Sequence, residues 1–293
     1  MRHLLTLDDL SDAEIDAVLD RARRHASTPV DPGPPFDLAL LFLDPSLRTR
    51  SGFHVAAGRL GGRVVDVSEA RWQPGMSGAE SFADTLRAVT GIVDVAVVRR
   101  AVDLGAVVAD GWAAASIVNA GDLGHHPSQA LIDIDAIESR CGPIGGLKVA
   151  VVGDLGMRAT SSFLAMLRRR PPGQLVLVAP STRLGGGAAS EFGERRGSIA
   201  DVAEVDAVYV GGLPEGEGAA HLDAAERRRY QVDGSHLDRW GPDVAVFSPM
   251  PVIDEVAVEA RQDPRVRMYE QSDAAVFVRM AVLELLLGRL DPR

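Results

Sequence analysis

Residues 38–50 read Leu38-Ala39-Leu40-Leu41-Phe42-Leu43-Asp44-Pro45-Ser46-Leu47-Arg48-Thr49-Arg50, an apolar run that gives way to a polar and basic cluster. The apolar run is short and bounded by a proline, which predicts a buried strand. Ser46 is a good N-cap residue, and the apolar spacing after it predicts a helix over residues 50–60. A buried strand that leads directly into a helix is the repeating unit of an α/β fold.

The cluster between this strand and this helix is a candidate anion site. The amides of residues 46–49 should point outward at a helix N-terminus, where the hydroxyls of Ser46 and Thr49 and the guanidinium of Arg48 would converge on a phosphate-sized anion. An ordinary helix cap followed by solvated arginines would explain the segment from Asp44 to Arg50 equally well. The cluster alone leaves both interpretations open.

Strand and helix patterns alternate along the first half of the chain. Helical apolar spacing marks residues 7–24, and further strands are predicted over 63–67, 94–98 and 116–119. Helices are predicted over 80–90, 106–113 and 129–140. This alternation predicts a parallel sheet whose strand-end loops carry the chemistry. We place a first domain at residues 1–140.

The Pro/Gly-rich segment Cys141-Gly142-Pro143-Ile144-Gly145-Gly146 is the clearest break in the chain. Beyond it, strands are predicted over 148–152, 175–179, 205–210 and 244–247, with a helix over 160–169. We therefore expect a second, Rossmann-like domain at residues 141–274. A last helix at 275–293 should return to the first domain. The predicted fold class is α/β, with two doubly wound domains that each have a central, mainly parallel sheet.

Composition excludes several classes of protein. The 293 residues are 46% hydrophobic, enough to fill two cores, and the formal net charge of -10 argues against nonspecific nucleic-acid binding. No apolar stretch has the length of a membrane span and no secretory signal pattern is present, so we expect a cytoplasmic protein with neither a membrane nor a nucleic-acid partner. A single cysteine, Cys141, excludes an intrachain disulfide framework and a cysteine cluster for zinc.

Four segments occur in a recognisable order along almost the whole chain. They are Asp44 to Arg50, Val97-Val98-Arg99, His126-Pro127-Ser128-Gln129 and Ser248-Pro249-Met250-Pro251. Supporting segments are Asn119-Ala120-Gly121-Asp122, Gly153-Asp154-Leu155 with Arg158, Ile253-Asp254-Glu255 and Val278-Arg279-Met280-Ala281. Together they resemble the aspartate/ornithine carbamoyltransferase family, and the aspartate branch more than the ornithine branch. The resemblance implies transfer of a carbamoyl group from carbamoyl phosphate to an amine, without a cofactor or metal.

The resemblance also implies roles for the donor residues. Ser46, Arg48 and Thr49 would hold the phosphate, with help from the amide of Leu47. Positive charge and preorganised donors there would stabilise the departing phosphate in the transition state. The first domain would then be the carbamoyl-phosphate-binding domain, and the second would bind the acceptor.

Other motif residues would act on the carbamoyl group. Arg99 and His126 would contact its carbonyl oxygen, so that with Arg48 and Thr49 they form the expected catalytic set. Gln129 and the carbonyl groups around Pro249 and Met250 would orient its amino group. The resemblance further implies a cis peptide bond between Met250 and Pro251.

Each of these residues also has an ordinary structural interpretation. His126 in isolation could start a helix or lie in a core, and Arg99 could be a solvated arginine at a strand end. Arg158 would bind a carboxylate of the acceptor by resemblance to the aspartate branch, but it could equally form an ion pair between domains.

One loop departs from the family pattern. The aspartate branch carries a lysine before its Glu-Ser/Thr pair and contributes it to a neighbouring subunit of a homotrimer. Here residues 73–81 read Gln-Pro-Gly-Met-Ser-Gly-Ala-Glu-Ser and contain no basic residue. Lys148 is the only lysine of the chain, so a coding bias would have left arginine in its place. Arg71 could substitute for it, and Trp72 resembles a tryptophan of the acetyl- and succinyl-ornithine branches.

The acceptor side departs as well. Gly211-Gly212-Leu213-Pro214 stands where the aspartate branch has an arginine and a glutamine, and Ser248 and Val252 replace a histidine and an arginine. Loss of a charge-assisted pair costs about 1.5 to 3 kcal/mol, enough to change acceptor choice at least tenfold. Our main hypothesis is a carbamoyltransferase that modifies an amino acid or related metabolite other than aspartate. The alternatives are a noncatalytic assembly or regulatory subunit and an ordinary aspartate carbamoyltransferase.

Overall fold

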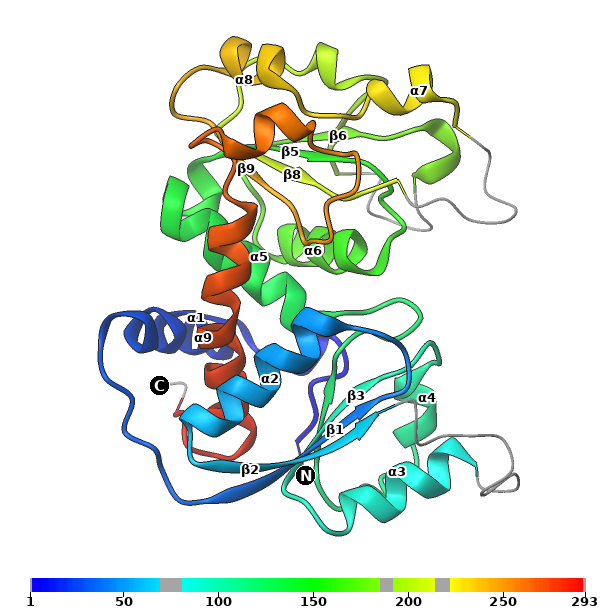
Figure 1. Cartoon of the computed structure of the whole chain (residues 1–293), viewed down its shortest axis with the longest axis vertical. Helices are drawn as coiled ribbons and strands as arrows, with labels where there is room; N and C mark the ends of the chain where they lie inside the picture. The colour runs from blue at the N-terminus through cyan, green and yellow to red at the C-terminus, as the bar shows by residue number, and fades with distance from the viewer. Residues whose placement is uncertain (1, 69–80, 185–191, 214–221, 292–293) are drawn as a thin grey trace. The chain divides into compact units, whose positions relative to one another are not determined.

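The computed structural model describes residues 2–68, 81–184, 192–213 and 222–291 (Figure 1). The chain divides into two compact units, Met1–Leu131 with Ala274–Arg293, and Ile132–Asp273. The change from one unit to the other falls within a helix, α5 (Pro127–Cys141), and the predicted domain boundary after residue 140 lies at the end of the same helix.

The first unit is built on four parallel strands. In spatial order they are β2 (Gly62–Ser68), β1 (Phe36–Phe42), β3 (Val95–Arg99) and β4 (Ser116–Asn119). The strands β1, β3 and β4 are almost entirely buried, as expected for a sheet that is covered on both faces. On one face lie α3 (Phe82–Thr90) and α4 (Leu104–Val108), and on the other lie α1 (Asp12–Ser27) and α2 (Leu47–Arg59) (Figure 1). A 3-10 turn, η1 (Leu7–Asp9), precedes α1.

The last helix, α9 (Met268–Leu286), packs on the first unit through its second half. Its Glu284 carboxylate accepts hydrogen bonds from Arg21 of α1, at 2.7 Å from Nε and 2.6 Å from Nη2. His25 Nε2, on the next turn of α1, lies 2.8 Å from the same carboxylate. The predicted return of the C-terminal helix to the first domain is confirmed.

The second unit contains five parallel strands. Their order is β7 (Glu194–Arg196), β6 (Gln174–Val178), β5 (Lys148–Val152), β8 (Ala207–Val210) and β9 (Ala245–Phe247). On one face, α6 (Arg158–Arg169) packs so that Phe163 stacks on Tyr209, with 4.3 Å between the ring centroids. The opposite face holds α8 (Gly234–Trp240), whose Leu237 and Trp240 enter the core. The helix α7 (Ala224–Arg228) and the 3-10 turns η3 (Ile144–Gly146), η4 (Ser181–Arg183), η6 (Ile199–Asp201) and η7 (Val258–Gln262) complete the described elements.

The α/β class and the two parallel sheets agree with the sequence prediction, and the strands β4 and β5 have the predicted ends. Several elements differ. The helix α2 begins at Leu47 instead of Arg50, and α9 begins at Met268 instead of Ala275. No prediction covered β7, α7 or α8. The first turns of α9 are mainly polar, so the apolar spacing from which the helix was predicted does not include them.

Candidate functional site

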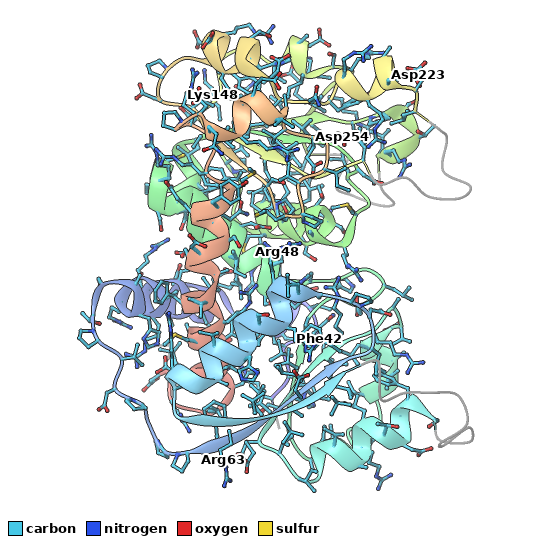
Figure 2. All side chains as sticks on the ribbon, in the orientation of Figure 1. Phe42, Arg48, Arg63, Lys148, Asp223 and Asp254 are labelled. Atoms are coloured by element: carbon cyan, nitrogen blue, oxygen red, sulfur yellow. The ribbon has the colours of Figure 1, made fainter. Side chains whose placement is uncertain are left out.

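The predicted donor residues lie at the carboxyl ends of neighbouring strands. The strands β1, β3 and β4 are adjacent and parallel, so the loops that follow them meet at one edge of the sheet. Figure 2 shows Arg48 at the beginning of α2, which follows β1 after a short loop. Arg99 ends β3, and His126 follows β4 just before α5. The fold therefore brings residues from three separate motifs to the same sheet edge.

The start of α2 leaves its polar groups available. Ser46 is the N-cap residue and is extended, with φ −162° and ψ 98°, but its hydroxyl makes no capping hydrogen bond. The first amides of a helix have no intrahelical acceptor. Thr49 is buried, whereas Arg48 is half-buried. This is the arrangement expected of a helix N-terminus that binds an anion.

Arg99 is tied to the loops on both sides of it. Its carbonyl oxygen accepts hydrogen bonds from the amides of Leu43 and Asp44, at 3.0 and 3.3 Å, which fixes the loop before α2. Its guanidinium donates through Nη1 to the carbonyl oxygen of Ala120 at 2.8 Å. The side chain is thus directed from β3 toward the loop that follows β4.

Gly121 allows Arg99 and His126 to come together. Its φ is +114°, and a Cβ atom there would lie 2.6 Å from Arg99 Nη1 and 3.3 Å from His126 Cδ2. Only glycine adopts this conformation readily and leaves that space open. In the sequence, Gly121 is only part of the supporting segment Asn119 to Asp122, whereas in the structure it leaves the space into which two predicted donor residues pack.

The loop that holds His126 is extensively hydrogen-bonded. Asn119 Oδ1 accepts from the Gly121 amide at 2.9 Å, and Asp122 Oδ1 accepts from the His125 amide at 2.7 Å. His126 is 5% exposed, and its carbonyl oxygen accepts from the Gln129 amide at 2.9 Å. Its Nδ1 lies 3.4 Å from the Ser128 hydroxyl. These bonds fix the backbone on either side of the imidazole.

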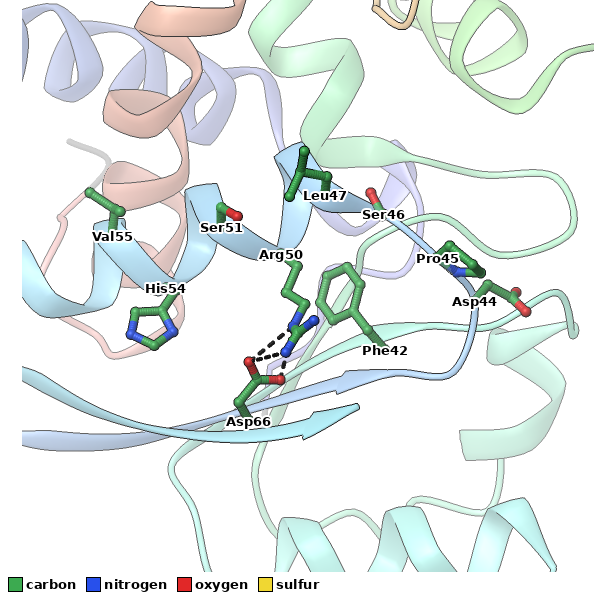
Figure 3. Close-up of a pocket in the computed structure, with 10 residues that line it drawn as sticks. All are labelled: Phe42, Asp44, Pro45, Ser46, Leu47, Arg50, Ser51, His54, Val55 and Asp66. Carbon is green, nitrogen blue, oxygen red and sulfur yellow. Dashed lines mark hydrogen bonds and ion pairs between the residues drawn. The ribbon is translucent and has the colours of Figure 1, made fainter. Parts of the chain in front are cut away.

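Arg50, the second arginine of the segment from Asp44 to Arg50, forms an ion pair with an acid on the edge strand β2. Its guanidinium binds Asp66 of β2, at 2.5 Å from Nη2 to Oδ2 (Figure 3). This hydrogen bond raises the pKa of Arg50. Arg50 and His54 lie on the side of α2 that lines a cavity of about 680 Å³ together with Phe42. Ser46 and Leu47 of the predicted donor set line the same cavity, whereas Arg50 is held by its ion pair with Asp66.

In the second unit, the turn after β5 packs closely against β8. Gly153 has φ +112°, and a Cβ atom there would lie 1.6 Å from the carbonyl oxygen of Gly211. The strand order changes direction between β5 and β8, which is where open α/β sheets bind ligands. Arg158 begins α6 just after this turn and is half-buried.

A small apolar pocket of about 170 Å³ opens at the same strand ends. It is lined by Met157, Gly212, Leu213, Pro249, Met250, Pro251, Ile253, Asp254 and Glu255. The peptide bond between Met250 and Pro251 is cis, as expected from the sequence. Glu255 Oε2 accepts from the amides of Ile253 and Asp254, at 2.8 and 3.0 Å. The carboxylate of Asp254 pairs with Arg227, with 2.6 Å to Nε.

A buried polar chain supports the loop after β9. The Tyr209 hydroxyl donates to Asp133 Oδ2 at 2.9 Å, and Gln271 Nε2 donates to Asp133 Oδ1 at 2.6 Å. Gln271 Oε1 in turn accepts from the Ser248 amide at 3.0 Å. Burial and the neighbouring Asp133 raise the pKa of Tyr209, so its hydroxyl remains a donor. Of these residues, only Ser248 belongs to a motif that the sequence analysis singles out.

Two predicted site residues, Arg71 and Trp72, lie outside the described residues. Within the described part of the chain, no group of three or more His, Cys, Asp or Glu side chains could hold a metal ion. The same residues include no helix that is long and apolar enough to cross a membrane.

Comparison with known sequences identifies relatives along the whole chain. A family model described as "Aspartate/ornithine carbamoyltransferase, carbamoyl-P binding domain" matches residues 2–139. The aspartate carbamoyltransferase catalytic subunit of Bifidobacterium adolescentis is 32% identical over 303 residues, which cover 98% of this chain and 94% of that protein. The catalytic subunit of Halorubrum lacusprofundi is 33% identical over 305 residues, with coverage of 99% and 96%.

Solved structures of similar proteins agree with this result. The catalytic subunit of M. jannaschii aspartate transcarbamoylase superposes with a TM-score of 0.85 at 27% identity and covers 98% of both chains. Aspartate transcarbamoylase from Trypanosoma cruzi, in complex with carbamoyl aspartate and phosphate, gives 0.87 at 27% identity, with coverage of 96% and 94%. Ornithine carbamoyltransferase from Pyrococcus furiosus shares the fold, with a TM-score of 0.84 at 23% identity and coverage of 99% and 98%.

Proposed function

Because the chain belongs to the aspartate/ornithine carbamoyltransferase family, we propose that it transfers the carbamoyl group of carbamoyl phosphate to an amino group of an acceptor and releases phosphate. The observation that carries the proposal is the convergence of Arg99 and His126 across Gly121, at the sheet edge where α2 also begins. A guanidinium and an imidazole that lie close together can both donate hydrogen bonds to a carbonyl oxygen, and so stabilise the negative charge that it gains during the reaction.

The donor would be held mainly by electrostatic interactions. We propose that the Ser46 and Thr49 hydroxyls, the Leu47 amide and the Arg48 guanidinium bind its phosphate group. Gln129, in the first turn of α5, would orient the amino group of the carbamoyl moiety. A neutral amine can then attack the carbonyl carbon while phosphate leaves, so that no covalent enzyme intermediate is required. Stabilisation that grows as charge develops is what lowers the barrier.

Two substitutions test these roles separately. We expect Arg48→Ala to abolish binding of carbamoyl phosphate, whereas His126→Ala mainly lowers turnover. The measurements are donor binding by calorimetry and phosphate release at saturating substrates. Unchanged kinetics in both variants would refute the assignment. Failure of the wild-type protein to bind carbamoyl phosphate at millimolar concentration would instead favour a noncatalytic subunit.

Aspartate is the first candidate acceptor. The relatives that match over nearly the whole chain are named aspartate carbamoyltransferase catalytic subunits, which supports this acceptor. Arg158, half-buried at the start of α6, is the residue that we propose for the α-carboxylate. A guanidinium can hold a carboxylate through two hydrogen bonds in a fixed orientation.

The pocket beside β8 and β9 favours a second candidate, an amino acid or related amine with an uncharged side chain. Its walls are mainly apolar, and Leu213 and Met250 contribute to them. Its lining residues include no basic side chain that could pair with a second carboxylate, and the acid Asp254 is already paired with Arg227. The adjoining residues 214–221 contain neither lysine nor arginine. An apolar side chain would fill this pocket without an unpaired buried charge.

An acceptor panel with carbamoyl phosphate distinguishes the two candidates. Preference for aspartate over leucine, valine and other neutral amino acids would support the first and refute the second. For a neutral acceptor, Ile253→Ala should raise KM about fivefold through loss of apolar contact. Val258→Ala is the matched control, because Val258 is equally exposed, at 72%, and lies outside the pocket lining. Donor KM should change in neither variant.

We further propose that the protein assembles as a homotrimer, as the resemblance to the family implies. Exposed apolar side chains near the donor residues support an interface there. Leu47 is 78% exposed, and Val65 of the edge strand β2 is 49% exposed. We expect Val65→Asp to dissociate the trimer, whereas Val258→Asp in the other unit should not. Sedimentation equilibrium measures both. A wild-type protein that is active as a monomer would contradict the proposal.

A further inference from the structure

A buried arginine outside the predicted donor set lies against α2. Arg279 belongs to the half of α9 that packs on the first unit, and only 5% of it is exposed. Its guanidinium carbon lies 5.6 Å from the centre of the Phe53 ring on α2. A Cβ atom at Gly52 would lie 2.1 Å from Nη1 of this arginine. The guanidinium therefore occupies the space that any side chain at position 52 would fill.

Arg279 differs from two partly buried arginines because it has no counter-ion among the described residues. Arg183 pairs with Asp154 at 2.7 Å, and Arg21 pairs with Glu284 at 2.6 Å. Among the described residues, no carboxylate and no hydrogen-bond acceptor contacts Arg279, and its Nε is fully buried without a partner. A buried charge in this situation costs several kcal/mol of stability. The ligand-free protein therefore retains a destabilising group at this position.

The uncompensated charge lies close to Arg48. Gly52 is one helical turn after Arg48, so positions 48 and 52 share one face of α2. Burial, with a further contribution from the charge of Arg48, lowers the pKa of Arg279 to about 10. The guanidinium still carries its charge at neutral pH. The two like charges therefore repel each other near the first turns of α2, and an anion bound there would relieve this repulsion.

We propose that Arg279 is a positioning residue of the donor site, which holds a second positive charge beneath Arg48 and thereby strengthens the binding of a doubly charged phosphate group. The inference rests on the proposed function, because it assumes that the anion binds at the start of α2. Arg279 acts through Arg48 and through its own field, and it need not touch the ligand. Gly52 serves the same purpose by leaving room for the guanidinium.

The test measures binding and stability separately in Arg279→Met, which keeps an extended side chain but removes the charge. Inorganic phosphate is the probe, titrated by calorimetry and by the shift in melting temperature. We expect the dissociation constant of phosphate to rise about tenfold, the usual scale for loss of one charge at a partly buried site. The ligand-free protein should melt at the same temperature or higher, because the unpaired buried charge is gone.

A residue with a merely structural role would give the opposite pattern. Lower ligand-free stability together with unchanged phosphate affinity in Arg279→Met would overturn the inference. Arg279→Lys keeps the charge and should retain most of the affinity. Gly52→Ala displaces the guanidinium without removing it, so it should also weaken phosphate binding. If Arg279→Met does not fold, unchanged phosphate affinity in Gly52→Ala would overturn the inference.

Two further variants make the outcomes distinguishable. Arg59→Gln is the matched control, because Arg59 is exposed on the last turn of α2 and lies 5.4 Å from the ring of Phe277 on α9. Its phosphate affinity should equal that of the wild type, and a tenfold loss there would overturn the inference. Arg48→Ala should abolish phosphate binding. A wild-type protein that does not bind phosphate would refute the proposed donor site as well as this inference.

Discussion

The cluster of Glu284, Arg21 and His25 should make the largest single contribution of any ion pair to the stability of the first unit. The Glu284 side chain is 5% exposed and is held by α1 on two adjacent turns. Glu284→Gln would leave the partly buried Arg21 guanidinium with only a neutral acceptor. We predict a loss of stability, because removing one partner of a buried pair leaves the other charge uncompensated.

The magnitude follows from the pKa of the carboxyl group. Burial alone would raise it, but the hydrogen bonds from Arg21 and His25 lower the pKa of Glu284 from 4.5 to about 2. At about 1.4 kcal/mol for each tenfold change, this corresponds to about 3 kcal/mol in favour of the folded state at neutral pH. For a unit of this size the melting temperature should fall by about 6 to 12 °C.

The direction in which folding shifts the pKa of Glu284 determines how the stability of the protein depends on pH. A carboxyl group whose pKa is lowered by folding stabilises the protein fully above its unfolded value near 4.5. The contribution is lost as the pH falls toward 2. The difference in stability between the wild type and Glu284→Gln should therefore shrink to about half at pH 3.

Thermal and urea unfolding between pH 3 and pH 7 provide the measurement. The matched control is Glu270→Gln on the same helix, because the Glu270 side chain is 65% exposed and pairs with Arg267 near the surface. Loss of this exposed ion pair should lower the free energy of unfolding by about 0.5 kcal/mol or less. Equal effects of the two substitutions, or a Glu284→Gln deficit that persists unchanged at pH 3, would refute the reasoning.

Three further predictions concern the two candidate sites. Tyr209→Phe removes the buried hydrogen bond to Asp133 and should cost about 1 to 3 kcal/mol in thermal unfolding; an unchanged melting temperature would contradict the buried chain. Gly121→Ala should lower kcat at least tenfold, on the order of 1.4 kcal/mol, by displacing Arg99; full activity would contradict that packing. Gly153→Ala should prevent correct folding, whereas Gly111→Ala, also at positive φ but in open space, should cost only about 1 kcal/mol. Equal solubility and melting temperature of these two glycine variants would contradict the close contact with β8.

The sequence predicts the fold class because the signals for the central strands are local. Each of them is a short apolar run bounded by turn residues, and burial on both faces maintains that pattern. The strand β7 lacks such a pattern, because Glu194-Arg195-Arg196 is charged and lies at the exposed edge of its sheet. The helices α7 and α8 are only 5 and 7 residues long, too short for an apolar spacing to stand out.

The candidate donor site could be predicted for a similar reason. Ser46, Leu47, Arg48 and Thr49 are contiguous, and the order of the remaining motifs matches a known family; the roles of these residues stay predictions. The buried chain from Tyr209 to Ser248 could not be found in this way. Its partners Tyr209 and Asp133 are 76 residues apart, and Gln271 is 138 residues from Asp133. No local periodicity records a contact over such separations, which arises only when the sheet and helices pack.

The charges of the two candidate sites explain why donor and acceptor choice can change independently. Every carbamoyl transfer from carbamoyl phosphate must stabilise a departing phosphate, so the positive charges that we propose for this role, those of Arg48 and Arg279, would be tied to the chemistry itself. The acceptor's side chain takes no part in bond formation. The pocket that we propose for this side chain can therefore be apolar, as at Leu213 and Met250, without altering the reaction. Substitutions in that pocket should then change the KM of the acceptor and leave the KM of carbamoyl phosphate unchanged.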